Sequence, residues 1–193
     1  PPMHLSELKQ KPITELLELA AAGETEIIGI CGGYQMLGRT IADPHGLEGS
    51  PGTELAGLGL LPAASVLRPA KRLARADGIH LTSGRPVGGY EIHHGETAAC
   101  TARSALSLAG PDRQHHLDGA VSANGKIWGT YLHGIFDGDP FRRWFIDTLR
   151  ARAGLARLDR VVHTYDLEPA LDRLAAAVRS ALDMDAIRRL LGI

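Results

Sequence analysis

Residues 27–38 read IIGICGGYQMLG, a short apolar run that breaks into glycines around one cysteine and then continues in a helical pattern. An apolar run without alternation is typical of a parallel strand covered on both faces. A strand that reverses into a helix within a few residues holds its central residue in a strained turn, for which flanking glycines leave room. The pattern therefore predicts a nucleophile elbow with Cys31 at its centre.

The position of Cys31 favours a reactive thiol. The backbone N–H groups of Gly32, Gly33 and Tyr34 would open the following helix, and the positive end of its dipole favours a thiolate over a thiol. The same N–H groups could hold an oxyanion. The alternative is an inert, buried cysteine at the end of a core strand, although such a cysteine needs no glycines on both sides.

Composition indicates one globular α/β domain. The 193 residues are 44% hydrophobic and 22% charged, and the formal net charge of −1 argues against nucleic acid or an anionic membrane as a partner. The two cysteines, Cys31 and Cys100, predict neither a disulfide framework nor a zinc site. The chain starts without a signal-peptide pattern, and no apolar run approaches the roughly 20 residues that span a bilayer, so a reducing cytoplasm is expected.

Outside the opening stretch, the sequence predicts short strands between helices. Helices are expected over residues 12–22 and 34–41, from Asp139 onward, and as two amphipathic helices from Glu168 onward. A long loop is expected over residues 47–59. The expected strands cover residues 64–67, 79–82, 87–93, 120–122 and, after an Asn124-Gly125 hairpin turn, 126–132. In the helix from Asp139, four residues share one apolar face, namely Phe141, Trp144, Phe145 and Leu149.

His133 is the best candidate for a base that serves Cys31. It follows the expected strand 126–132 and precedes a glycine, and α/β enzymes present catalytic side chains from such strand ends. A lone histidine in this place is also compatible with a plain surface or core residue. A third stretch, residues 88–96 (GGYEIHHGE), combines tyrosine, carboxylates and imidazoles that could line a polar pocket.

A metal site is not expected in that third stretch. His93 and His94 are adjacent on a predicted strand, so their side chains point to opposite faces and make a poor chelating pair. The second histidine pair, His115-His116, lies in a polar segment that reads as a solvated loop.

Three blocks, in this order, resemble the glutamine amidotransferase domain of cobyric acid synthases. They are residues 31–38 (CGGYQMLG), 89–93 (GYEIH) and 129–137 (GTYLHGIFD), and the resemblance runs over about residues 27–149. It implies a class I, flavodoxin-like domain in which a mostly parallel central sheet is flanked by helices. It further implies that residues 1–193 form a single domain, the C-terminal part of a larger synthase, with an atypical or incomplete front end over 1–26.

The resemblance also implies an activity, the hydrolysis of glutamine to glutamate and ammonia. Cys31 would be the nucleophile and His133 the general base and acid, while Tyr90, Glu91 and His93 would border the glutamine pocket. An ATP-dependent synthetase domain, in the same or a separate chain, would use the ammonia to amidate adenosylcobyrinic acid a,c-diamide during cobalamin synthesis. This chain would hold no cofactor or metal, whereas ATP and magnesium are expected in the synthetase.

Two positions depart from the wider class I pattern. Most members carry a glutamate two residues after the histidine, but this chain has Ile135, so a Cys–His dyad is expected, with Glu91 as one candidate to orient the imidazole. No Pro-Gly-rich oxyanion segment precedes Cys31. The Gly-rich Lys-Ser/Thr motif for ATP is also absent, so this chain is not expected to perform the synthetase reaction.

Two other functions fit parts of the pattern. The amidotransferase subunit that serves the amidation of lipid II shares the CGGYQ block. A non-catalytic remnant that structurally supports a synthetase partner would fit the unusual front end. Labelling of Cys31 by an electrophilic glutamine analogue would argue against the remnant.

Overall fold

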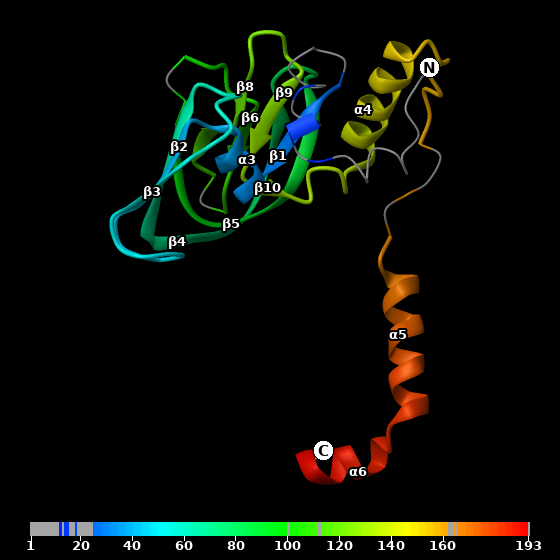
Figure 1. Cartoon of the computed structure of the whole chain (residues 1–193). Coiled ribbons are helices and arrows are strands. Elements are labelled where there is room, and N and C mark those ends of the chain that lie inside the picture. Colours follow the sequence, from blue (N-terminus) through cyan, green and yellow to red (C-terminus); the bar gives the residue numbers. More distant parts are fainter. Residues whose placement is uncertain are drawn as a thin grey trace. The chain divides into compact units, whose positions relative to one another are not determined.

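The computed structural model describes residues 12, 14–15, 18, 25–99, 101–111, 113–161, 164 and 166–192. The chain divides into two compact units, Pro1–Val161 and Val162–Ile193. The larger unit contains all the described strands together with α3 and α4 (Figure 1). Most of the helix expected over residues 12–22 lies outside the described residues, as does Cys100.

A small sheet of three strands leads to Cys31. Its order is β1 (Ile27–Ile30), β9 (Ile127–Thr130) and β8 (Ala120–Val121), in which β1 and β9 are parallel and β8 is antiparallel to β9. The turn between β8 and β9 has Gly125 in the left-handed region, at φ 73°, with its N–H donating to the Ser122 carbonyl. The parallel strand expected for the apolar run before Cys31 and the expected hairpin turn at Asn124-Gly125 are therefore confirmed.

A second sheet of seven strands is built on one long hairpin. In this hairpin β4 (Ala63–His80) and β5 (Arg85–Ala99) pair antiparallel, with a shift of register between Leu67 and Arg72. Five shorter strands complete the sheet: β2 (Thr40–Asp43), β3 (Thr53–Ala56), β6 (Leu106–Ala109), β7 (His115–Asp118) and β10 (Leu132–His133). The order is β10-β5-β4-β2-β3, and β6 pairs with both β4 and β7.

The α/β class is confirmed, but the sheets are mixed rather than mostly parallel. Among the described strands, β1 pairs parallel with β9 and β2 with β4, and the other pairs are antiparallel. The reason is connectivity. A parallel pair needs a crossover of a dozen or more residues, whereas β4 and β5, or β6 and β7, follow each other through short turns.

Several element boundaries differ from those expected. The helix after Cys31 is short, because α3 spans Gly32–Leu37 and residues 40–43 form β2. The expected loop over 47–59 contains β3. The expected strand 64–67 lies in the first part of β4, whereas the expected strand 79–82 overlaps only the last two residues of β4, and residues 81–82 belong to the turn before β5. Residues 68–73 in the middle of β4 are exposed, so this part of the strand carries no apolar alternation.

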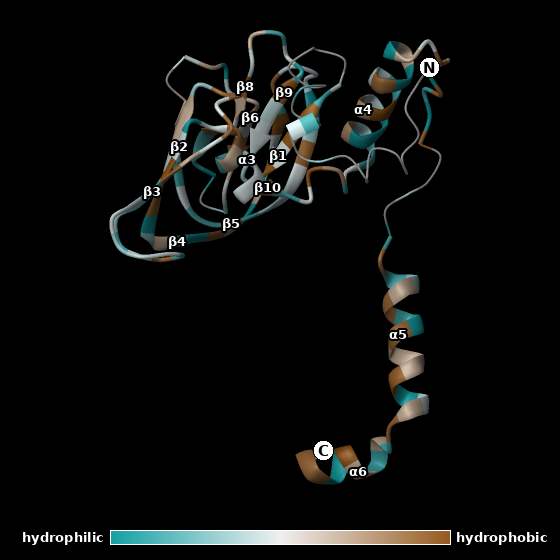
Figure 2. Ribbon diagram, viewed as in Figure 1, coloured by the Kyte–Doolittle hydropathy of each residue, from teal (hydrophilic) through white to brown (hydrophobic). Residues whose placement is uncertain are grey.

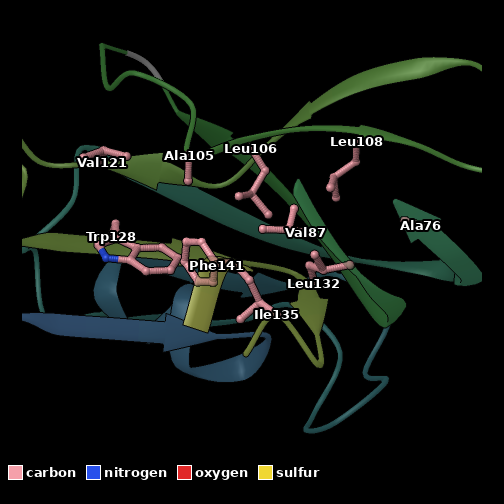
Figure 3. Close-up of a cluster of buried hydrophobic side chains, with 10 residues drawn as sticks. All are labelled: Ala76, Val87, Ala105, Leu106, Leu108, Val121, Trp128, Leu132, Ile135 and Phe141. Atoms are coloured by element: carbon pink, nitrogen blue, oxygen red, sulfur yellow. The ribbon is translucent and has the colours of Figure 1, made fainter. Parts of the chain in front are cut away.

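The core of the larger unit is formed by side chains of both sheets and of α4 (Asp139–Arg152). Phe141 of α4 is fully buried and belongs to a cluster with Trp128, Leu132 and Ile135 (Figure 3). Trp144 and Phe145 pack against this cluster as expected, whereas Leu149 is exposed. The helix starts at Asp139 as expected, and Gly138 is its N-cap.

His80, at the end of β4, lies buried in this core and is neutral. Its ring is 5.0 Å from the ring of Phe141 and 5.2 Å from that of Trp144, centroid to centroid. The Ser83 backbone N–H donates to His80 Nδ1, at 3.3 Å, which places the proton on Nε2. Burial lowers the pKa of the His80 imidazole from its ordinary 6.5 to about 4.

This depressed pKa makes the stability of the larger unit depend on pH. Between pH 6.5 and about 4 the unfolded chain binds a proton at His80 that the folded chain excludes, so stability falls as the pH falls. We expect the free energy of unfolding to decrease by about 2–3 kcal/mol across this window. Denaturant unfolding at several pH values would measure it. His80→Leu should flatten the dependence, whereas a change at the exposed His45, His45→Gln, should leave it in place.

The C-terminal unit consists of two helices, α5 (Glu168–Ala181) and α6 (Met184–Leu191), which confirms the two expected helices. Hydrophobic and hydrophilic residues alternate around α5 (Figure 2). Neither helix contains a buried residue. The exposed large apolar side chains of the two helices are Leu171, Leu174, Val178, Leu190 and Leu191.

Candidate active site

Cys31 lies at the junction between β1 and α3, where it forms the N-cap of the helix. Its backbone has φ 54° and ψ −114°, a conformation that costs free energy in any residue other than glycine. Two hydrogen bonds fix this turn: the Cys31 N–H donates to the Thr130 carbonyl at 2.9 Å, and the Gln35 N–H donates to the Cys31 carbonyl at 3.1 Å. The strained residue is thus held by β9 on one side and by α3 on the other.

Glycines let α3 lie close to the strands beneath it. A Cβ at Gly29 would lie 2.6 Å from the Gly33 carbonyl oxygen, and a Cβ at Gly129 would lie 2.3 Å from the Tyr34 ring. Neither contact is possible for a real side chain. At Gly32 and Gly33, by contrast, a Cβ would meet nothing within 4 Å. Of the glycines that flank Cys31, the one required for close packing is therefore Gly29, before the cysteine.

Strand β5 connects Cys31 with His133. The Cys31 thiol donates to the Ile92 carbonyl oxygen at 3.7 Å, and His133 of β10 lies directly opposite Tyr90 in the antiparallel register. Tyr90 and Ile92 are two residues apart on one strand, which corresponds to about 7 Å along the backbone. Residues that are 102 positions apart in the sequence are therefore held on neighbouring parts of the same strand.

The imidazole of His133 stacks on the Tyr90 ring. The two rings are nearly parallel, at 7°, with their centroids 5.1 Å apart. His133 Nε2 is buried and has no hydrogen-bond partner within the described part of the chain. Cys31 and His133 are not hydrogen-bonded to each other, since the thiol is directed to the Ile92 carbonyl.

Glu91 is buried, with 2% of its surface exposed, and its carboxylate faces Arg72, His93 and His116. Its oxygens accept from Arg72 Nε at 2.7 Å and lie 3.2 Å from His116 Nε2. Burial raises the pKa of the Glu91 carboxyl, but the neighbouring His93 and the guanidinium of Arg72 outweigh burial and lower the pKa to about 2. The carboxylate is therefore ionised and already paired. The hypothesis that Glu91 orients His133 has no support in these contacts.

His93 follows Ile92 on β5, and its side chain is also nearly buried. Its ring stacks on Tyr131 with centroids 3.8 Å apart, and its Nδ1 donates to the Gly95 carbonyl at 2.7 Å. Its Nε2 has no hydrogen-bond partner among the described residues and lies 3.8 Å from the Glu91 carboxylate. Besides the Nε2 of His133, this is the one buried side-chain nitrogen or oxygen left unpaired in the described part of the chain.

Two residues that the sequence analysis did not select complete this network. Arg72 comes from the exposed middle of β4, and His116 comes from β7 rather than from a solvated loop. Neither residue lies near Glu91 in the sequence, and only the pairing of β4 with β5 and β6 brings them there. A local pattern could not have identified them.

A hollow of about 670 Å³ opens beside Tyr90 on the surface of β4 and β5. Its lining residues are Leu73, Ala74, Arg75, Asp77, Gly89 and Tyr90. No group of three or more His, Cys, Asp or Glu side chains suited to a metal ion occurs among the described residues. In that same part of the chain, no helix has the length and apolar character needed to cross a membrane.

Comparison with known families identifies the domain. Residues 3–141 match the family of CobB/CobQ-like glutamine amidotransferase domains. The chain belongs to this family. As a CobB/CobQ-like amidotransferase domain, it contains the three blocks 31–38, 89–93 and 129–137 within the matched range, and they meet around β5.

Curated relatives of this amidotransferase domain are much longer proteins. The present chain is 41% identical to a cobyric acid synthase of Nitratidesulfovibrio vulgaris, over 86% of this chain and 36% of that protein. A cobyric acid synthase of Cereibacter sphaeroides is 47% identical, over 82% of this chain and 31% of that protein. The adenosylcobalamin biosynthesis bifunctional protein CobDQ of Leptospira interrogans is 41% identical, over 94% of this chain and 20% of that protein. The chain thus spans between a fifth and about a third of these relatives.

Proposed function

We propose that this domain hydrolyses glutamine to glutamate and ammonia through a Cys31–His133 dyad. The observation that carries the proposal is the anchoring of both residues to β5, Cys31 at Ile92 and His133 at Tyr90. The strained backbone of Cys31 and the unpaired Nε2 of His133 support it, because functional groups are often found in such conformations and without internal partners.

In the proposed reaction, Cys31 attacks the side-chain amide carbon of glutamine. The thiol first turns away from the Ile92 carbonyl, and His133 takes up its proton. The C–N bond then breaks, His133 returns the proton to the leaving nitrogen, and ammonia departs from a glutamyl thioester. Water, deprotonated by His133, attacks the thioester, so that glutamate leaves and the thiol is restored. The lack of a hydrogen bond between Cys31 and His133 before substrate binds is compatible with this role, since catalytic hydrogen bonds often form or tighten only in the complex.

The tetrahedral intermediates carry a negative oxygen that needs donors. We assign this role to the backbone N–H groups of Gly32, Gly33 and Tyr34, which open α3 and have no acceptor inside the helix. Residues 90–93 border the glutamine site in this proposal, through Tyr90 at the hollow and through Glu91 and His93 beneath it.

The ammonia would be consumed by an ATP-dependent synthetase part, with ATP and magnesium bound there. This extension rests on the relatives named cobyric acid synthase, of which the chain covers about a third. The acceptor would then be adenosylcobyrinic acid a,c-diamide, and the process cobalamin biosynthesis.

An electrophilic glutamine analogue tests the dyad directly. In the full-length protein at neutral pH, we expect one equivalent of label on Cys31, identified in the corresponding peptide by mass spectrometry. Glutamine in excess should protect the thiol, and His133→Asn should slow the labelling. Absence of label from an intact, folded protein would favour the non-catalytic remnant instead.

A further inference from the structure

We infer that Tyr90 is the positioning residue for the His133 imidazole and acts by ring stacking. The catalytic importance of this contact rests on the proposed function, whereas the contact itself does not. In the wider class I pattern a carboxylate two residues after the histidine would orient the ring, but position 135 here is an isoleucine buried in the core.

The geometry of the two rings carries the inference. Tyr90 and His133 are direct cross-strand partners in an antiparallel pair, so their side chains leave the sheet on the same face. The rings are nearly parallel, at 7°, with centroids 5.1 Å apart. Tyr90 remains 47% exposed and belongs to neither apolar core cluster, so its ring is not held there by core packing.

Glu91, the residue that the sequence suggested as an orienting group for His133, is engaged elsewhere. The Glu91 carboxylate is paired with Arg72 and His116, on the opposite side of the strand from Tyr90. His133 Nε2 accepts no hydrogen bond from the described residues and stays free for a proton. An imidazole without such a bond needs another contact to fix its ring plane, and the face of Tyr90 provides one.

The backbone keeps the two strands close enough for this contact. Gly89, next to Tyr90, lies so near β10 that a Cβ there would be 1.9 Å from the His133 carbonyl oxygen. Gly134 follows His133 in the left-handed region at φ 77°, which turns the chain away directly after the imidazole. The pairing of β5 with β10 thus places the two rings next to each other.

Kinetics of two variants at the same position test the role. In the full-length protein we expect Tyr90→Phe, which keeps the aromatic face, to retain the kcat of glutamine hydrolysis. Tyr90→Leu should lower kcat by about 10- to 100-fold, because a misplaced catalytic group costs that much. Since Tyr90 also borders the proposed glutamine site, KM can rise, but by less than kcat falls. Leu55→Ala, at a residue of β3 that is 59% exposed and does not line the hollow beside Tyr90, serves as the control and should change neither constant. A raised KM with unchanged kcat would overturn the inference and make Tyr90 a substrate-binding residue.

A spectroscopic measurement judges the stack independently of activity. In protein with isotope-labelled histidine, the ring protons of His133 should carry a ring-current shift from Tyr90, with the signal assigned by its loss in His133→Asn. Tyr90→Phe should preserve this shift and Tyr90→Leu should abolish it. A shift that survives in Tyr90→Leu would disprove the contact. If Cys31→Ala retained glutamate release, the proposed dyad would fail, but this measurement would still decide the position of the imidazole.

Discussion

Cys31→Ala is expected to lower glutamine-dependent glutamate release by at least about 10³-fold, because the thioester of the proposed reaction forms on the Cys31 sulfur. The substitution removes one sulfur atom from a half-buried side chain that donates to the Ile92 carbonyl and packs at the edge of an apolar core cluster. The fold should therefore survive, and thermal unfolding should show a midpoint close to that of the wild type. The measurement is glutamate formation in the full-length protein under saturating glutamine.

Ammonium salts separate the two halves of the proposed reaction in the same variant. If the domain only supplies ammonia, Cys31→Ala should still amidate the corrinoid acceptor when ammonium replaces glutamine. A variant that fails with both nitrogen sources would place the defect in folding or in assembly with the synthetase. Undiminished glutamate release by Cys31→Ala would disprove the dyad.

Gly89→Ala is expected to reduce both the stability and the glutaminase activity. The new Cβ would lie 1.9 Å from the His133 carbonyl oxygen, and both Gly89 and His133 belong to paired strands, so β10 must move away from β5. Such overpacking costs about 1–3 kcal/mol of unfolding free energy. A displacement of His133 by about 1 Å should lower kcat by about 100-fold. Denaturant unfolding and glutaminase kinetics measure the two effects.

The adjacent glycine provides a matched control. A Cβ at Gly88 would lie 2.5 Å from Asp77 Oδ1, which is the far end of an exposed side chain and can turn away. Gly88→Ala should therefore have little effect on kcat and a smaller effect on stability than Gly89→Ala. Equal effects of the two substitutions would mean that the general loss of glycine flexibility, rather than the contact with His133, is responsible.

Local patterns predicted well wherever a short segment decides its own structure. The apolar run before Cys31 forms a parallel strand, Gly125 makes the hairpin turn, and the two C-terminal helices occur as expected. The pattern was least informative along β4, since residues 68–73 are exposed and show no alternation. Strands β3, β6 and β7 were also missed. The larger sheet is mixed rather than mostly parallel because β4 with β5, and β6 with β7, pair as antiparallel hairpins.

The sequence by itself determined the family and supplied the candidate catalytic residues, because Cys31, His133 and the GYEIH block are readable as short motifs in a fixed order. Only the tertiary structure decided how they relate. It anchors Cys31 and His133 at neighbouring positions of β5, stacks Tyr90 on His133, and commits Glu91 to Arg72 and His116. The physical reason is that these contacts depend on strand register between segments far apart in the chain, and register is set by the packing of whole sheets rather than by any local pattern.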